Sequence, residues 1–279
     1  MNVFIGLGKM GLPIAKHFER KHNFHVWDTN FPRCKNFNNI MSWTDLAPES
    51  IKTIVSCLPN STIVEKEFNY MLDLLQPNSY WIDLTSGDPL ISRKLYQYGK
   101  RYQSKIHFID CGISGGSGKA MEGKLTSIVG GDKTAVKKIF PYFYTFSQKV
   151  FYVGPSGSGH AVKAINNALM AINLWAAAEG VSTLEKFGIR ADSAIAAINS
   201  SSGRSIATQQ RFPNNILTNK YDYGYSLELL RKDVQNALAV CENVGSVNPM
   251  MRRQLTLLTD ALRILEKDAD HTEIYKLFQ

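Results

Sequence analysis

The sequence predicts an α/β domain over residues 1–156, followed from 157 to 279 by a long interdomain helix and an all-α domain. Over the first 155 residues, short apolar runs alternate with amphipathic stretches, which is typical of a largely parallel sheet with right-handed helical crossovers. After Gly154-Pro155-Ser156-Gly157 only helical patterns follow. A chain of 279 residues has room for both domains.

Each element is predicted from its local pattern. The expected strands are the apolar runs 2–6, 24–27, 53–57, 80–84, 106–109, 126–129 and 150–153. The helical patterns between them are 12–20, 63–75, 90–98 and 134–143. Ser158 is a candidate N-cap for the long helix, which runs without proline to Phe187 and stops at Gly188. Further helices are expected at 192–198, 226–244, 249–266 and 272–278.

The net charge of +8 comes from one part of the chain, because residues 93–149 hold eleven basic and three acidic side chains. This segment is either a solvated basic face or a positive field that attracts an anionic ligand. A nucleic-acid partner is not expected, because the sequence has no dense Lys/Arg run and no RNA-binding signature.

The remaining composition points to a cytoplasmic protein. No apolar run is long enough to span a bilayer, and residues 1–5 lead straight into a glycine turn without the pattern of a signal peptide. The four cysteines are far apart and show no CxxC spacing. We therefore expect reduced thiols and no metal site.

A glycine motif follows the first expected strand and opens the first expected helix. Its residues are Gly6, Leu7, Gly8, Lys9, Met10 and Gly11, and this context predicts a dinucleotide whose pyrophosphate lies at the helix N-terminus. Asp28 ends the second strand, where a carboxylate accepts hydrogen bonds from the adenosine ribose. It would repel a 2′-phosphate, so it favours NAD over NADP, although the nearby Arg33 weakens that preference.

A second glycine-rich segment, Asp110–Gly118, has four glycines in nine residues directly after a strand. We interpret it as a loop that points backbone N–H groups at a carboxylate, the alternative being a flexible surface loop.

The start of the long helix holds Lys163 and Asn167, which are four residues apart and therefore share one helix face. A lysine in the first turn lies near the positive end of the helix dipole, which lowers its pKa and suits acid/base chemistry. Taken alone, Lys163 is an ordinary surface lysine, and His160 is a capping or packing histidine. Leu229–Asp233, preceded by Tyr225, reads alone as a solvated charged turn.

Taken together, these segments resemble the β-hydroxyacid dehydrogenase family, which includes 3-hydroxyisobutyrate dehydrogenase and, more distantly, 6-phosphogluconate dehydrogenase. The matching motifs are GLGKMGLPIA, DCGISGGSGKAMEGKLTSIVGG, GSGHAVKAINNALMA and LLRKDVQNAL, in the family's order over nearly the whole chain. Asn166-Asn167 replaces the His-Asn of the sugar-phosphate enzymes, and the chain is much shorter than they are, so phosphogluconate is disfavoured.

The resemblance implies a role for each motif. Lys163 would be the general acid/base, with Asn167 beside it in the catalytic pair. The substrate side would comprise Ser114, Gly115, Gly116, Tyr225 and Asp233, the last also orienting Lys163; some relatives have phenylalanine at Tyr225. The cofactor side would add Leu58, Pro59, Ser86 and Lys232, and Ile63 departs from a polar residue of some relatives.

The function implied is NAD-dependent hydride transfer between the nicotinamide and a short 3-hydroxy acid or its semialdehyde. The alternatives are an NADPH-dependent semialdehyde reductase and a non-catalytic dinucleotide-binding protein. The expected partners are a small carboxylate substrate and further copies of the chain, as a homodimer or homotetramer. Arg204 is either a surface arginine or a residue near the active site.

Overall fold

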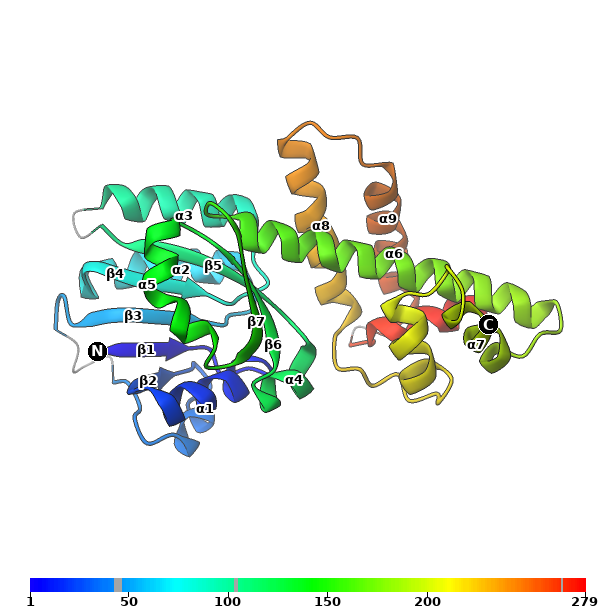
Figure 1. Cartoon of the computed structure of the whole chain (residues 1–279), viewed down its shortest axis with the longest axis horizontal. Helices are drawn as coiled ribbons and strands as arrows, with labels where there is room; N and C mark the ends of the chain where they lie inside the picture. The colour runs from blue at the N-terminus through cyan, green and yellow to red at the C-terminus, as the bar shows by residue number, and fades with distance from the viewer. Residues whose placement is uncertain (43–46, 103–104, 267) are drawn as a thin grey trace. The chain divides into compact units, whose positions relative to one another are not determined.

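The computed structural model describes residues 1–42, 47–102, 105–266 and 268–279 (Figure 1). These form two compact units, Met1–Lys163 and Ala164–Gln279, whose boundary lies inside the long helix. The predicted boundary of 156/157 lies at the start of that helix. No helix in the described ranges is long and apolar enough to cross a membrane.

The first unit is built on a seven-stranded sheet in the order β2-β1-β3-β4-β5-β6-β7. The strands are β1 Asn2–Ile5, β2 Phe24–Trp27, β3 Ile51–Ser56, β4 Leu75–Asp83, β5 His107–Ser114, β6 Leu125–Gly130 and β7 Ser147–Gly154. Among the strand pairings of the described residues, β5–β6 is antiparallel and the other five are parallel, which confirms the prediction of a largely parallel sheet. Because β1 lies between β2 and β3, the direction of the connections reverses there, and this is the edge at which such sheets bind ligands.

Helices cover both faces of the sheet because side chains alternate along each strand. Phe4 of β1 packs in one cluster with α1 (Gly11–Lys21), α4 (Gly116–Glu122) and α5 (Lys133–Phe143). Its neighbours Val3 and Ile5 pack in another cluster, with α2 (Ser61–Met71) and α3 (Pro89–Arg101). Two short 3₁₀ helices, η1 Phe31–Asn36 and η3 Leu72–Leu74, complete the unit as described.

The prediction of a loop over Asp110–Gly118 is wrong. β5 continues to Ser114, where it pairs with Thr126 of β6, and α4 begins at Gly116. Gly112 was taken as one of the glycines of that loop. A Cβ at Gly112 would lie 2.5 Å from the Cβ of Lys163, so glycine is needed there for a helix to approach the strand.

The long helix α6 spans Ser158–Lys186, 29 residues. Lys163 is the sixth of these residues and therefore lies in the second turn, so its placement in the first turn was wrong. The dipole effect falls off within the first turn. The dipole argument for a lowered lysine pKa therefore loses most of its force.

The second unit is helical, as expected. It holds the remainder of α6, then α7 Ala191–Asn199, η4 Ala207–Ile216, α8 Leu227–Asn243, α9 Pro249–Ile264 and the 3₁₀ helix η5 His271–Phe278. Small residues of α6 such as Ala168 and Ala171 pack in one core with Phe212 of η4 and Leu230 of α8. The sequence did not predict η4, a π-helix that contains Pro213, a rare kind of helix.

Candidate active site

The predicted cofactor residues of the first unit gather at one edge of the sheet. Parallel strands present their carboxyl ends at the same edge, and each predicted segment follows such an end. The glycine motif follows β1, Asp28 follows β2, Leu58-Pro59 follows β3 and Ser86 follows β4. Segments that are up to 80 residues apart in the sequence therefore face the same side of the first unit.

The glycines of the motif have different roles in the turn. Gly6 adopts φ +93°, and a Cβ there would lie 2.3 Å from the carbonyl oxygen of Cys57. A Cβ at Gly11 would lie 1.9 Å from the carbonyl oxygen of Gly6, so α1 can begin this close to β1 only with glycine. At Gly8 no described atom outside the turn would lie within 4 Å of a Cβ. The open backbone at Gly8, beside the N–H groups at the start of α1, fits a pyrophosphate.

Asp28 is tied into this turn. Asp28 is 7% exposed, and its carboxylate accepts hydrogen bonds from the backbone N–H of Leu7 at 2.6 Å and of Asn30 at 2.7 Å. The guanidinium of the half-exposed Arg33 lies 3.7 Å away. A carboxylate held here fits a ribose hydroxyl, and its negative charge opposes a 2′-phosphate, whereas the charge of Arg33 would attract one.

A residue that the sequence reading missed supports the loop after β3. The N–H of Leu58 donates to the hydroxyl of Thr85 at 3.0 Å, and the N–H of Thr85 donates to Asp83 at 3.1 Å. Thr85 therefore joins the loops after β3 and β4, next to the predicted Ser86. Ile63 lies in the first turn of α2, where its N–H donates to Asn60.

The segment predicted to bind a carboxylate joins β5 to α4. Ser114 ends the strand, Gly115 and Gly116 have φ values of +139° and +72°, and Gly116 begins the helix. The other end of α4 is held by His17 of α1, whose Nε2 lies 3.0 Å from the carbonyl oxygen of Ala120. The helix that starts at the cofactor turn thus also contacts the helix that starts at Gly116.

Lys163 is brought to the same strand as Ser114. Asp110 of β5 is fully buried and accepts hydrogen bonds from the N–H groups of Gly157, at 2.7 Å, and His160, at 3.0 Å. These bonds hold the start of α6 on the sheet, with Lys163 packed over Gly112, two residues before Ser114. No local pattern in the sequence indicates this role of Asp110.

His160 has the packing role expected for it. The side chain is buried, with Nδ1 2.8 Å from the hydroxyl of Ser92 and Nε2 3.3 Å from the carbonyl oxygen of Asp83.

In the second unit, a buried carboxylate gathers the other predicted residues. Oδ2 of Asp233 accepts hydrogen bonds from Nδ2 of Asn167 at 2.6 Å and from the hydroxyl of Tyr225 at 2.5 Å. Nζ of Lys232 lies 3.5 Å from Oδ1. Burial raises the pKa of Tyr225 well above its ordinary value, and the charge of Asp233 adds to this increase. Tyr225 therefore stays protonated, and its hydroxyl donates a hydrogen bond to the carboxylate.

Comparison with known proteins matches both units. A family model described as the NAD binding domain of 6-phosphogluconate dehydrogenase matches residues 3–154. Residues 157–278 match a model described as NAD-binding of NADP-dependent 3-hydroxyisobutyrate dehydrogenase. The mitochondrial 3-hydroxyisobutyrate dehydrogenase of Homo sapiens is 30% identical over 247 residues, 83% of this chain and 72% of the relative. The chain belongs to the β-hydroxyacid dehydrogenase family. The resemblance inferred from the motifs is thereby confirmed, and the protein is an NAD(P)-dependent dehydrogenase.

A second relative and two solved structures are also similar to this chain. The 2-(hydroxymethyl)glutarate dehydrogenase of Eubacterium barkeri is 28% identical over 250 residues, 84% of this chain and 80% of the relative. Among solved structures, the 3-hydroxyisobutyrate dehydrogenase of Mycobacterium tuberculosis with L-serine superposes with a TM-score of 0.91 at 21% identity, over 100% of this chain and 98% of that one. The structure of Psf3 in complex with NADP+ and 2-OPP superposes with a TM-score of 0.85 at 22% identity, over 100% of both chains. At these identities the solved structures show that this dehydrogenase shares their fold.

Proposed function

We propose that this dehydrogenase transfers a hydride between NAD and a short 3-hydroxy acid or its semialdehyde, with Lys163 as the general acid/base. The observation that supports the proposal is the packing of the Lys163 side-chain stem over Gly112, on the strand that ends at Ser114. The names of both curated relatives are those of dehydrogenases of short hydroxy acids, which supports the substrate class.

Each residue then has one task. The bound dinucleotide supplies a hydride acceptor at the nicotinamide C4. Lys163, as the neutral amine, takes the proton of the substrate hydroxyl on oxidation and returns it on reduction. Ser114, Gly115 and Gly116 bind the substrate carboxylate, and Asn167 binds substrate while Asp233 holds its side chain.

The remaining residues complete the proposed site. Tyr225 holds Asp233 on the substrate side, and Lys232 contacts the cofactor. The other proposed cofactor contacts are the glycine motif, Asp28, Leu58, Pro59 and Ser86.

A substrate screen tests the proposal. NADH or NADPH formation is followed with 3-hydroxyisobutyrate, serine, glycerate, 4-hydroxybutyrate and phenylserine, with NAD and with NADP. We expect turnover of at least one 3-hydroxy acid with NAD. If none of the five acids is turned over with either cofactor, the proposed function is wrong.

Arg33, 3.7 Å from Asp28, favours a second candidate, an NADPH-dependent reductase of a short semialdehyde. That reductase would use NADP better than NAD in the same screen.

We also propose an assembly and a location for this dehydrogenase. The long α6 and the helical second unit fit a homodimer or homotetramer, which sedimentation equilibrium would measure. All four cysteines are free thiols, which fits a reducing compartment such as the cytoplasm.

Replacing Asp28 should change the choice of cofactor. Asp28→Ser removes the negative charge next to the adenosine ribose, so the ratio of kcat/KM for NAD to that for NADP should fall by roughly tenfold, about 1.4 kcal/mol. Arg33→Ala is the matched control and should move the ratio in the opposite direction. A wild-type enzyme that uses NADP as well as NAD would contradict the assignment of Asp28.

Replacing Ser114 should weaken substrate binding. Ser114→Ala removes one donor to the carboxylate in the ground state and transition state alike, so KM for the acid should rise by roughly tenfold with a smaller change in kcat. Ser117→Ala, an exposed serine three residues later in α4, should leave KM unchanged. An unchanged KM in Ser114→Ala would place the carboxylate elsewhere.

A further inference from the structure

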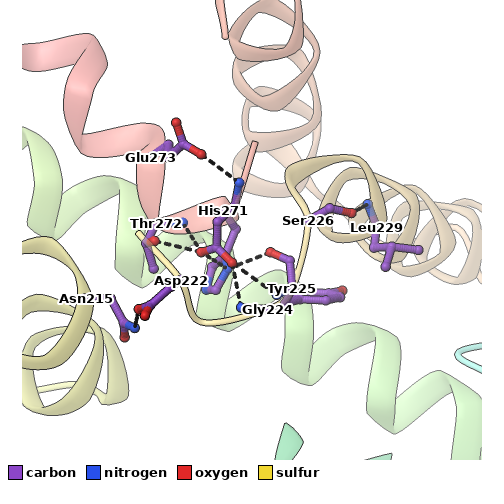
Figure 2. A network of polar contacts seen from close by, with 10 residues as sticks. Asn215, Asp222, Gly224, Tyr225, Ser226, Leu229, His271, Thr272 and Glu273 are labelled. Carbon is purple, nitrogen blue, oxygen red and sulfur yellow. Dashed lines mark hydrogen bonds and ion pairs between the residues drawn. The ribbon is translucent and has the colours of Figure 1, made fainter. Parts of the chain in front are cut away.

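The segment that carries Tyr225 is bound to a distant part of the chain. Figure 2 shows Gly224 and Tyr225, which precede α8, meeting His271 and Thr272 near the C-terminus. Ser226 forms an antiparallel bridge with Asp270, and the N–H of Leu227 donates to the carbonyl oxygen of Ala269 at 2.9 Å. Residues 224–227 and 269–272 thus form one small backbone-bonded junction within the second unit.

Both backbone polar groups of Tyr225 are bound at this junction. Oδ2 of Asp270 accepts hydrogen bonds from the N–H of Gly224 at 2.8 Å and of Tyr225 at 3.1 Å. The carbonyl oxygen of Tyr225 accepts from the N–H of His271 at 3.0 Å and lies 2.9 Å from its ring Nδ1. A carbonyl oxygen only accepts, so Nδ1 carries the proton in this contact.

Asp270 itself is rigidly held. It is 8% exposed, and Oδ1 accepts from the N–H of Thr272 at 3.0 Å and from its hydroxyl at 2.6 Å. Its N–H donates to Glu273, which completes a capping box at the start of η5. Burial acts to raise the pKa of Asp270, but hydrogen bonds from His271 and Thr272 outweigh burial and lower the pKa to about 2. The carboxylate is therefore ionised at neutral pH, and both of its oxygens can accept hydrogen bonds.

The hydroxyl of Tyr225 bonds the carboxylate that also holds Asn167. A shift of the Tyr225 backbone would move this hydroxyl and release one of the donors that fix Asp233. Tyr223 packs against Arg211 and His271, whereas a Cβ at Gly224, which adopts φ +90°, would meet no described atom within 4 Å. At Gly224 and Tyr225 the backbone N–H groups are held by the carboxylate of Asp270.

We propose that Asp270 is a positioning residue for substrate binding, which acts by fixing the backbone of Tyr225 and through it Asp233 and Asn167. This inference rests on the proposed function, in which Asn167 binds the substrate. It makes the C-terminal segment 269–273 part of the active-site architecture, although Asp270 itself does not act on the substrate.

The test compares two variants that loosen opposite sides of the same carboxylate. Asp270→Asn keeps the volume but puts an amide donor against N–H donors, and it should raise KM for the hydroxy acid by roughly tenfold or more while the Kd for NAD stays unchanged. Thr272→Val removes only the hydroxyl bond to Oδ1, so it should lower the melting temperature without raising KM. An equal rise of KM in both variants would show a merely structural role and overturn the proposal.

A double-mutant cycle tests the route through Tyr225. In the Tyr225→Phe background, Asp270→Asn should change KM by about threefold or less, because the hydroxyl through which it acts is already gone. If the rise of KM in the double variant equals the product of the rises in the two single variants, the proposed route is wrong.

Amide hydrogen exchange tests the positioning without any turnover, so it stands even if the substrate screen fails. The amides of Gly224 and Tyr225 should exchange at least tenfold faster in Asp270→Asn than in the wild type and in Thr272→Val. Unchanged exchange at these two amides would overturn the inference.

Discussion

Lys163→Ala should cut kcat by roughly 10²- to 10⁴-fold, the usual contribution of a general acid/base group. The loss should fall on kcat because the amine acts on the proton that moves in the transition state, whereas the dinucleotide is expected to bind at the carboxyl edge of β1 to β4. The Kd for NAD should therefore stay within a few-fold of the wild-type value. Single-turnover hydride transfer and NAD titration measure the two quantities separately.

Two further variants test whether the loss of kcat is specific to the Lys163 amine. Lys163→Arg keeps the positive charge but should not restore activity, because a guanidinium does not give up its proton near neutral pH. Lys186→Ala, at the exposed last turn of the same helix, is the matched control and should leave kcat unchanged. Turnover near the wild-type rate in Lys163→Ala, or a loss that only follows loss of folding, would show that another group moves the proton.

Local patterns predicted most of the fold and the cofactor turn. Strands such as β1 and β2 are short apolar runs, and the glycine motif has its meaning within eleven residues of the N-terminus, so no distant contact is needed to recognise it. Glycine was misleading at Gly112, where it serves close packing against Lys163 and not a loop. The sequence analysis also missed η4, because π-helices are rare and no helical pattern was recognised around Pro213.

The residues that position the site left no local signal. Asp110 bonds the start of α6 from 47 and 50 residues away, and Asp270 bonds Gly224 and Tyr225 from 46 and 45 residues away. In sequence both read as ordinary carboxylates beside a strand and a helix. Their partners are backbone N–H groups, which carry no residue-type signature, so only the folded chain reveals the pairing.

Asp110→Ala should destabilise the protein by about 3–5 kcal/mol, because two buried N–H groups, those of Gly157 and His160, lose their acceptor at once. An ordinary helix cap contributes about 1 kcal/mol. Asp132→Ala is the matched control. Asp132 caps α5 through a single bond from the N–H of Ala135, and α5 does not carry a proposed catalytic residue.

The same substitution should also reduce activity in the molecules that remain folded. The bonds to Asp110 hold the turn of α6 that precedes Lys163, so their loss should shift Lys163 relative to Gly112 and lower kcat by roughly ten- to hundredfold at a temperature well below the melting point. Urea titration measures the free energy of unfolding, and steady-state kinetics on the folded fraction measures kcat. Asp110→Asn keeps one acceptor oxygen, so its free energy of unfolding and its kcat should both lie between those of Asp110→Ala and the wild type. If Asp110→Ala loses no more stability than Asp132→Ala, or keeps full kcat when folded, then α6 is held by other contacts and Asp110 does not place Lys163.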